Sequence, residues 1–295
     1  MRRFPALAPI RLVLLDAFDT LVTPRSAPHL QYAVVARQHG LRVADNEVKA
    51  AFKQAFRSTS LQHPNYGLET DIASPDEWWQ LVIRRTFAPQ LHTQITPEQY
   101  NATIDSLSHQ LVHRFGTNQA YDMFPDVIPA LQRLAQLRFK DKQAVSLALA
   151  TNSDSRILSV LKSFGLDRFL QLDTHATPAP SSTLTFGPTL SYFEKCAKPD
   201  PRFFQAAVRR AAKSTFKAAD VLYVGDQLHE DFWGATEAGL QAAWLQRPTT
   251  LESNQPYQQV SQDRNSDQEQ AYTKERTITS LSDVVDIVTQ SHNPL

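Results

Sequence analysis

Two acidic side chains that follow the first apolar run of the chain are candidates for chemistry. Residues 10–15 have the length of a buried strand in a parallel sheet, and Asp16 comes directly after them, with Asp19 close behind. Open α/β sheets bind their ligands outside the carboxyl ends of the strands, so Asp16 stands where a rigidly held nucleophile is useful. Alternatively, Asp16 and Thr20 only begin a turn that leaves the strand.

Three later segments have the same form, in which a short apolar run leads to a polar group. One run ends at Thr151 and Asn152, Lys198 stands just before a helix start, and a third run leads to Asp226 and Asp231. Each of these residues alone is an ordinary polar group at the end of a strand. Their joint order, with an acid, a hydroxyl, a lysine and two spaced acids, is a much more specific pattern.

This order resembles the haloacid dehalogenase superfamily of hydrolases. The resemblance rests on the segments Lys-Pro-Asp-Pro at 198–201 and Val-Gly-Asp-x4-Asp-x2-Gly-Ala at 224–235, together with the earlier Asp and Thr motifs. It implies an α/β fold, with a Rossmann-like parallel sheet as core and an inserted all-helical cap domain. Within the superfamily, the Asn-Tyr-Gly segment at 65–67 and the Trp pair at 78–79 resemble the eukaryotic group named haloacid dehalogenase-like hydrolase domain-containing protein 3.

The resemblance also implies a role for each motif. In the phosphatases of the superfamily the first acid attacks phosphorus and becomes an aspartyl-phosphate, and Asp16 is the match. Thr151 would hydrogen-bond a phosphoryl oxygen, and Lys198 would neutralise charge on the nucleophile and the transferring group. The implied cofactor is Mg²⁺, which requires hard oxygen ligands. Its expected ligands are Asp16, the backbone carbonyl of Phe18, Asp226 and Asp231. We expect substrate contacts from Asn152, Asn65 and Tyr66; alternatively, residues 63–67 are only a surface turn.

One position departs from the phosphatase pattern. Those enzymes place a second Asp two residues after the nucleophile, where it protonates the leaving group and then activates water, but this chain has Phe18 there. Asp19 comes one residue later, and on an extended segment its side chain points to the opposite side. A lost acid/base typically lowers the rate by about 10²–10⁴. We therefore expect aryl and acyl phosphates to react and alkyl phosphates to react very poorly.

Two other functions stay open from the sequence. The Asp-Ala-Phe segment at 16–18 resembles the 2-haloacid dehalogenases, in which the Asp attacks carbon without a metal or an acid. Against this, the spaced acids Asp226 and Asp231 have the magnesium-binding form. The third alternative is a catalytically degenerate fold that only binds a ligand or a partner.

The intervening segments predict two domains. Periodic helices at 27–40, 45–56, 74–87 and 96–115 form a cap domain at 26–115, over the carboxyl ends of the strands. Residues 1–25 and 116–295 form the core, with strands at 10–15, 145–150, 169–172, 221–224 and 242–245. Core helices are expected at 125–137, 154–164, 201–212, 232–238 and 280–289. Polar stretches at 174–190 and 249–276 are expected to be long loops.

Charge and composition exclude several classes of protein. The 295 residues carry 30 basic and 30 acidic side chains, a balance that argues against a nucleic-acid or membrane-surface binder. No apolar run has membrane-spanning length, and the basic start lacks the apolar stretch of a secretory signal. The single cysteine, Cys196, allows no internal disulfide and fits a reducing compartment. We therefore expect a cytoplasmic enzyme that acts on a small-molecule substrate.

Overall fold

The structure is a computed structural model that describes residues 8–139, 144–173, 187–211, 216–247 and 267–292. Its centre is a six-stranded parallel sheet with the strand order β5-β4-β1-β6-β7-β8. The strands are β1 (Leu12–Leu15), β4 (Ser146–Thr151), β5 (Thr189–Leu190), β6 (Val221–Gly225), β7 (Gln241–Leu245) and β8 (Thr277–Ile278). The predicted Rossmann-like core is therefore confirmed.

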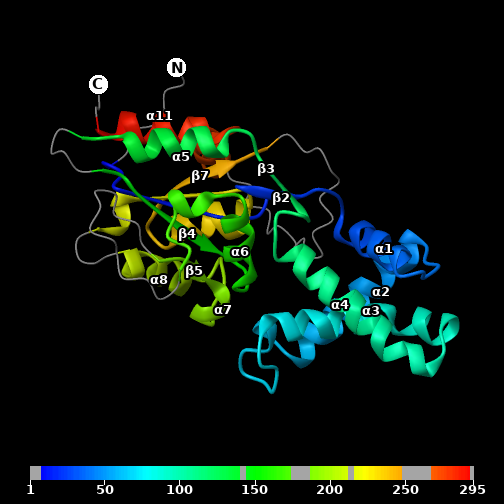
Figure 1. Ribbon diagram of the computed structural model, residues 1–295. Helices are drawn as coiled ribbons and strands as arrows, with labels where there is room; N and C mark the ends of the chain where they lie inside the picture. Colours follow the sequence, from blue (N-terminus) through cyan, green and yellow to red (C-terminus); the bar gives the residue numbers. More distant parts are fainter. Residues whose placement is uncertain (1–7, 140–143, 174–186, 212–215, 248–266, 293–295) are drawn as a thin grey trace.

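Helices cover both faces of the sheet, which explains why the central strands are apolar without alternation. Val13 and Leu15 of β1 face one helical layer, and Leu12 and Leu14 face the other. The helices of the first layer are α5 (Val127–Gln136), α6 (Arg156–Ser163) and α11 (Leu281–His292). The second layer holds α8 (Pro201–Ala211), the π-helix η4 (Leu228–Trp233) and α9 (Gly234–Glu237). Figure 1 shows α5 and α11 together on one side of the sheet and α8 on the other.

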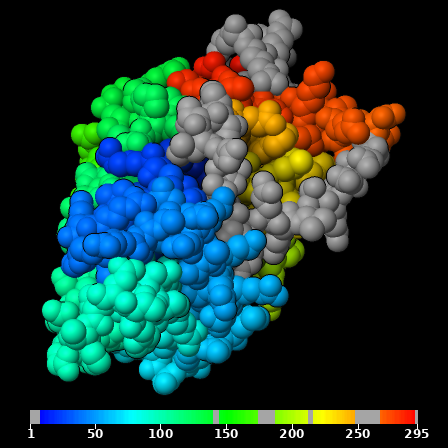
Figure 2. Space-filling view, turned by 90° about the vertical axis from the view of Figure 1, so that its right-hand side faces the viewer, coloured from blue at the N-terminus to red at the C-terminus, as the bar shows by residue number. Residues whose placement is uncertain are grey.

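A separate group of helices is inserted after the first strand. These helices are α1 (Pro28–Gln38), α2 (Asp45–Gln62), α3 (Pro75–Gln94) and α4 (Pro97–Phe115), with the 3₁₀ helix η1 (Asn65–Gly67) between α2 and α3. They bury their own apolar cluster, which includes Tyr32, Phe87 and Leu107. Residues 27–115, all of which the structure describes, contain no strand, as predicted. Figure 1 shows this helical insertion as a lobe beside the sheet, and Figure 2 shows its residues, in blue and cyan, gathered in one region of the surface.

Two short antiparallel strands join the insertion to the sheet. The chain leaves through β2 (Val22–Pro24) and returns through β3 (Tyr121–Met123), which pair with each other. The sequence analysis does not predict this pair, because three-residue strands are too short to show a hydrophobic period. The pair holds the start and the end of the insertion side by side.

The helical insertion lies over the carboxyl ends of core strands, as the sequence predicts. The indole Nε1 of Trp79 in α3 donates to Asp154, which follows β4, at 2.9 Å. The Asn65 side chain in η1 donates to the carbonyl of Tyr192, which follows β5, at 3.0 Å. The insertion is thus held against the edge of the sheet where Asp16 also lies.

The predicted strand at 169–172 is wrong. The chain turns at Gly165 into the 3₁₀ helix η2 (Leu166–Arg168), and Leu170 and Leu172 pack into the core without pairing with a strand. The edge strand is instead β5, which lies in the last two residues of the predicted 174–190 loop. A short apolar run predicts that its side chains are buried, but it does not distinguish a strand from an irregular segment that packs into the core. Residues 174–186 of that expected loop lie outside the described residues.

The predicted loop at 249–276 is wrong in its last part. Residues 267–276 form helix α10 (Asp267–Arg276), in spite of their polar composition. Tyr272 stacks on Trp233, with ring centroids 6.0 Å apart, and the Arg276 guanidinium lies 3.8 Å from the Tyr272 ring. The contact of Tyr272 with Trp233 anchors a helix whose polar sequence shows no apolar period. Residues 248–266 lie outside the described part of the chain.

The remaining helix predictions differ mainly at their ends. In the insertion, α2 and α3 extend to Gln62 and Gln94, beyond the predicted ends at 56 and 87. The helix expected at 232–238 starts earlier, as the π-helix η4. The chain also forms a short helix, α7 (Ser191–Glu194), directly after β5. Among the described residues, no helix combines the length and the hydropathy that a membrane span requires.

Candidate active site

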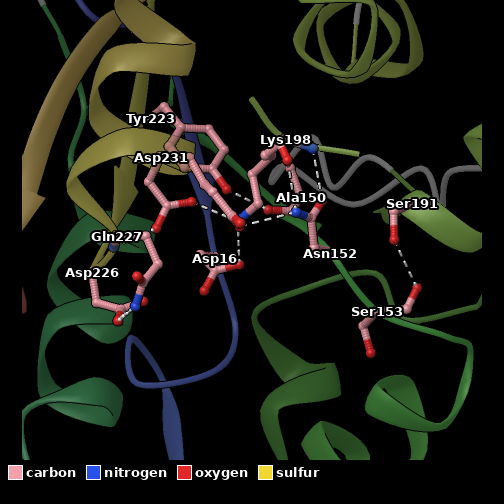
Figure 3. Close-up of polar contacts among 11 residues, drawn as sticks. Asp16, Ala150, Asn152, Ser153, Ser191, Lys198, Tyr223, Asp226, Gln227 and Asp231 are labelled. Atoms are coloured by element: carbon pink, nitrogen blue, oxygen red, sulfur yellow. Dashed lines mark hydrogen bonds and ion pairs between the residues drawn. The ribbon is translucent and has the colours of Figure 1, made fainter. Parts of the chain in front are cut away.

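Three carboxylates converge at the carboxyl ends of two neighbouring strands. Asp16 follows β1, Asp226 follows β6, and Asp231 lies in the π-helix η4 that begins just after β6. Each acid places one oxygen so that the three atoms lie within 4.8 Å of one another. Figure 3 shows Asp16 and Asp231 reaching toward Lys198, with Asp226 beside them. The first and last motifs of the sequence therefore meet in space.

The local backbone explains how Asp231 comes to lie beside the strand end. In the π-helix, the amide N–H groups of Asp231 and Phe232 both donate to the carbonyl of Gln227, at 3.0 and 3.2 Å. A Cβ atom on Gly225 would lie 2.2 Å from Oδ2 of Asp231. Only a residue without a side chain therefore lets the acid pack here. This contact gives a physical reason for the glycine of the Gly-Asp motif.

Lys198 connects two of the three acids. Its Nζ donates to Oδ1 of Asp16 at 2.7 Å and to Oδ1 of Asp231 at 2.5 Å. Burial alone would lower the pKa of Lys198, but the carboxylates of Asp16 and Asp231 raise it well above its usual value. Lys198 is therefore a buried ammonium group at neutral pH.

The position of Lys198 is fixed through its backbone. Its amide N–H donates to Oδ1 of Asn152 at 2.8 Å, and Nδ2 of Asn152 donates to its carbonyl at 3.1 Å (Figure 3). The same Nδ2 donates to Oε2 of Glu230 at 3.1 Å. A Cβ atom on Gly234 would lie 2.9 Å from Cβ of Pro199, so this glycine lets the lysine segment pack closely on α9. Asn152, predicted to bind substrate, thus also positions the lysine.

Negative charge is concentrated at this edge of the sheet. Burial, followed by the carboxylates of Asp231, Asp16 and Asp19, raises the pKa of Asp226 well above its usual range. Burial also raises the pKa of Asp231, to about 6, although Lys198 acts against that shift. Both shifts mean that the ionised acids repel one another and lack water, which a cation at this site would relieve.

The donor set fits a divalent cation. Three carboxylates and one ammonium group leave two negative charges in the cluster. All the acidic donors are hard oxygen atoms, which Mg²⁺ prefers. Oδ1 of Asp231 accepts from Lys198 and Oδ2 accepts from the N–H of Gln227 at 2.8 Å, so this acid suits support of a metal through water. Asp16 and Asp226 would be the direct carboxylate ligands.

Three further residues that the sequence singles out, Thr151, Phe18 and Asp19, lie in three different environments. Thr151 is the last residue of β4, which pairs with β1, and it is buried. The Phe18 ring packs against Tyr121, with centroids 5.8 Å apart. Asp19 has a φ of +52° and accepts a hydrogen bond from Thr23 at 2.7 Å, so the backbone here turns and is not extended. Its carboxylate contributes to the raised pKa of Asp226.

Asn65 and Tyr66 lie on the wall of a cavity of about 460 Å³ between the helical insertion and the core. Asn152 and Ser191 contribute to the same cavity from the core. Cys196 also lines it, and burial raises the pKa of its thiol, which disfavours the nucleophilic thiolate. All three predicted substrate contacts, Asn65, Tyr66 and Asn152, therefore border one common space.

The sequence analysis misses several residues of the site. Gln227 contacts both late acids, since its Nε2 donates to Asp226 at 2.5 Å and its N–H donates to Asp231. Glu230 is half-buried against Asn152, and burial raises the pKa of its carboxyl group. Gly225 stands in the quoted motif, so its spacing to Asp226 is a usable signal. Glu230 gives no such signal, because a single acid in a helix is usually a solvated side chain.

Comparison with known proteins gives one consistent result. The sequence model of the family described as haloacid dehalogenase-like hydrolase matches residues 10–239. The mouse haloacid dehalogenase-like hydrolase domain-containing protein 3 is 29% identical over 244 residues, which cover 83% of this chain and 85% of the mouse protein.

Solved structures give the same fold. A 2-haloacid dehalogenase from Pseudomonas syringae superposes with a TM-score of 0.56 at 20% identity, covering 95% of this chain and 99% of that one. A HAD-hydrolase from Bacillus subtilis, bound to magnesium, gives 0.53 at 17% identity over 95% and 98% of the two chains.

Proposed function

Because the chain belongs to the haloacid dehalogenase-like hydrolase family, we propose that it is a magnesium-dependent hydrolase of a small phosphorylated molecule, with Asp16 as nucleophile. The observation that carries this proposal is the cluster of Asp16, Asp226 and Asp231 around the ammonium group of Lys198. We also propose that residues 26–115 form the cap domain, and that residues 1–25 and 116–295 form the core.

The proposed reaction has two steps. A carboxylate oxygen of Asp16 attacks phosphorus, and the bond from phosphorus to the ester oxygen breaks, with the electron pair leaving on that oxygen. Water then attacks the phosphorus of the aspartyl-phosphate, which releases inorganic phosphate and restores Asp16. Mg²⁺, when bound, would neutralise charge on the transferring phosphoryl group.

The protein's own groups support this chemistry by position and charge. The hydrogen bond from Lys198 holds the Asp16 carboxylate in one orientation, and the ammonium group balances charge on the phosphoryl oxygens. Thr151, the last residue of the strand that pairs with β1, would donate its hydroxyl to a phosphoryl oxygen. Phe18 supplies no proton, so the ester oxygen leaves unprotonated unless Asp19 takes that role.

A magnesium titration of phenyl phosphate hydrolysis tests the proposal. The wild type should release phosphate in proportion to Mg²⁺ binding, and Asp16→Asn and Asp226→Asn should each lose this activity. Asp220→Asn is the matched control, because Asp220 lies before the amino end of β6, away from the carboxyl end where the cluster forms. Magnesium-independent hydrolysis, or full activity in Asp16→Asn, would contradict the proposal.

The aromatic side chain at position 18 favours one second candidate, a metal-independent dehalogenase. In that reaction Asp16 would attack carbon and displace halide. Halide leaves without a proton, so the reaction would need no acid at position 18, where the Phe18 ring packs against Tyr121. Halide release from 2-chloropropionate in the presence of a chelator tests this candidate. Release of phosphate with magnesium, together with no release of chloride, would exclude the dehalogenase and support the phosphatase.

A further inference from the structure

We propose that the cavity of about 460 Å³ between α2, η1 and the segment 191–197 binds the aromatic ring of the substrate, so that the substrate class is an aryl phosphate. This inference rests on the proposed function, because it names the leaving group of that reaction. The volume is in the range of pockets that hold small molecules.

The wall that the insertion contributes is aromatic. Phe56, Tyr66 and Trp78 line it, and Trp78 meets the other two rings edge to face, with centroids 5.5 and 5.3 Å apart. The indole N–H of Trp78 is already satisfied by the carbonyl of His63 at 2.9 Å. The rings are therefore fixed by one another, and such rings favour contact with another flat apolar group.

The wall that the core contributes includes polar groups. Asn152, Ser191 and Lys195 line the cavity there, together with Cys196 and Ala197. Lys195 also pairs with Glu69 of the insertion at 2.7 Å. One apolar side and one polar side suit a planar ring that carries a polar substituent, and a few polar groups are enough to orient such a ligand.

Unusual backbone conformations gather at this cavity. Among the described residues, the non-glycine residues with positive φ are Asp19, Asn65, Tyr66 and Lys195. The last three line the cavity, with φ values of 47°, 55° and 54°. Such conformations cost energy and persist mainly where a site needs them, at active sites and ligand clamps. The strain therefore marks this cavity as a binding site, independently of its rings.

The cavity borders the catalytic cluster through Asn152. This side chain lines the cavity and also makes two hydrogen bonds to the backbone of Lys198, whose ammonium group contacts Asp16 (Figure 3). Asn152 therefore belongs both to the wall of the cavity and to the surroundings of the catalytic cluster. The ring of an aryl phosphate would lie in the cavity while its phosphoryl group reaches Asp16.

The chemistry at Phe18 agrees with this substrate class. A phenolate is a stable leaving group that departs without a proton, whereas an alkoxide needs a general acid. The aromatic cavity and the missing acid are different observations, and both favour an aryl ester over a sugar phosphate.

The test compares phenyl phosphate with acetyl phosphate, since neither leaving group needs a proton but only the first has a ring. Ser60 lines the cavity, and Ser58 lies on the same helix outside it. We expect Ser60→Phe to fill the cavity and to lower the ratio of kcat/KM for phenyl over acetyl phosphate by about tenfold or more. Tyr66→Ala should also lower this ratio, and Ser58→Phe should leave it unchanged.

The outcomes separate this inference from the function on which it rests. An unchanged ratio in Ser60→Phe and Tyr66→Ala, with both substrates hydrolysed, would overturn the aryl site and leave the hydrolase intact. No hydrolysis of either substrate by the wild type with Mg²⁺ would overturn the proposed function itself. Circular dichroism and acetyl phosphate turnover identify a misfolded variant, because misfolding changes both. A variant whose cavity is only filled keeps the wild-type spectrum and still hydrolyses acetyl phosphate.

Discussion

Phe18 determines, on this account, how the enzyme treats its leaving group. Its ring is packed against Tyr121 and offers no proton, while Asp19 lies on a left-handed turn and accepts a hydrogen bond from Thr23. Two chemistries are therefore distinguishable at this turn. Either the ester oxygen leaves unprotonated, or Asp19 protonates it from an unusual position.

A series of phosphate esters with graded leaving-group pKa distinguishes these two cases. We expect a steep decrease of kcat/KM, which reports the phosphorylation step, with increasing leaving-group pKa in the wild type. Phe18→Asp should increase alkyl phosphate turnover by at most about 10²–10⁴, the usual contribution of a placed acid. Phe18→Asn is the matched control, because it removes the same ring without adding an acid. A flat series in the wild type that becomes steep in Asp19→Asn would identify Asp19 as the proton donor.

The pKa of Asp231 gives a second prediction, on pH. Its folded-state pKa of about 6 lies above its usual value of 3.8, so without metal its contribution to stability is complete below about pH 4 and is lost as the pH rises through about 6. Mg²⁺ binds ionised acids, so the melting temperature gained with Mg²⁺ should be larger at about pH 7.5 than at about pH 5. Asp226→Ala should abolish the gain at both values. A gain that is independent of pH would contradict the acidic site.

At the scale of elements, the site depends on close packing between β6 and the π-helix η4. Asp231 reaches Lys198 only because Gly225 leaves room for its carboxylate. Similarly, the helical insertion depends on a few contacts to the core. Asp154 accepts from Trp79 of the insertion and pairs with Arg156, whose guanidinium lies 4.6 Å from the Trp79 ring.

Gly225→Ala tests the packing at the strand end. The new Cβ would overlap Asp231, so the acid must move away from Lys198 and leave a buried charge without its partner. We expect unfolding free energy to decrease by about 3 kcal/mol or more and the Mg²⁺-induced increase in melting temperature to disappear. Gly187→Ala is the control, since nothing lies within 4 Å of its added Cβ. Equal melting behaviour in the two variants would contradict this packing argument.

Adjacent tryptophans allow a matched test of the contact between the insertion and the core. Trp78 and Trp79 each donate one indole hydrogen bond at 2.9 Å, the first to His63 within the insertion and the second to Asp154 of the core. Trp79→Phe should therefore loosen the insertion against the core and accelerate hydrogen exchange in the core segment 191–194. Trp78→Phe should lower stability without this selective effect. The same exchange pattern in both variants would show that Asp154 does not hold the insertion.

For the whole molecule, residue patterns predict the sheet and the site better than the edges of the fold. Continuous apolar runs identify β1, β4 and β6, and the acids after them are brought together because parallel strands end at one edge. The same logic fails at β5 and α10, where pairing and helix formation depend on distant partners such as Tyr272 with Trp233.

The contacts that complete the site are also tertiary. The hydrogen bonds between Asn152 and Lys198 join segments that are far apart in the chain, and so does the cavity between the insertion and the core. The periodicity of a local sequence window cannot predict such contacts. Gly225 is an intermediate case. The sequence shows that a glycine precedes Asp226, but only the structure shows that a side chain at 225 would overlap Asp231.

Mass spectrometry of acid-quenched enzyme detects whether Asp16 carries a phosphoryl group during turnover. After mixing with phenyl phosphate and Mg²⁺, the peptide that contains Asp16 should gain the mass of one phosphoryl group. The gain should accumulate as a burst, since no acid at position 18 activates water for the second step, and it should be absent in Asp16→Asn. Phosphate release without any adduct on this peptide, or release that persists in Asp16→Asn, would contradict the account.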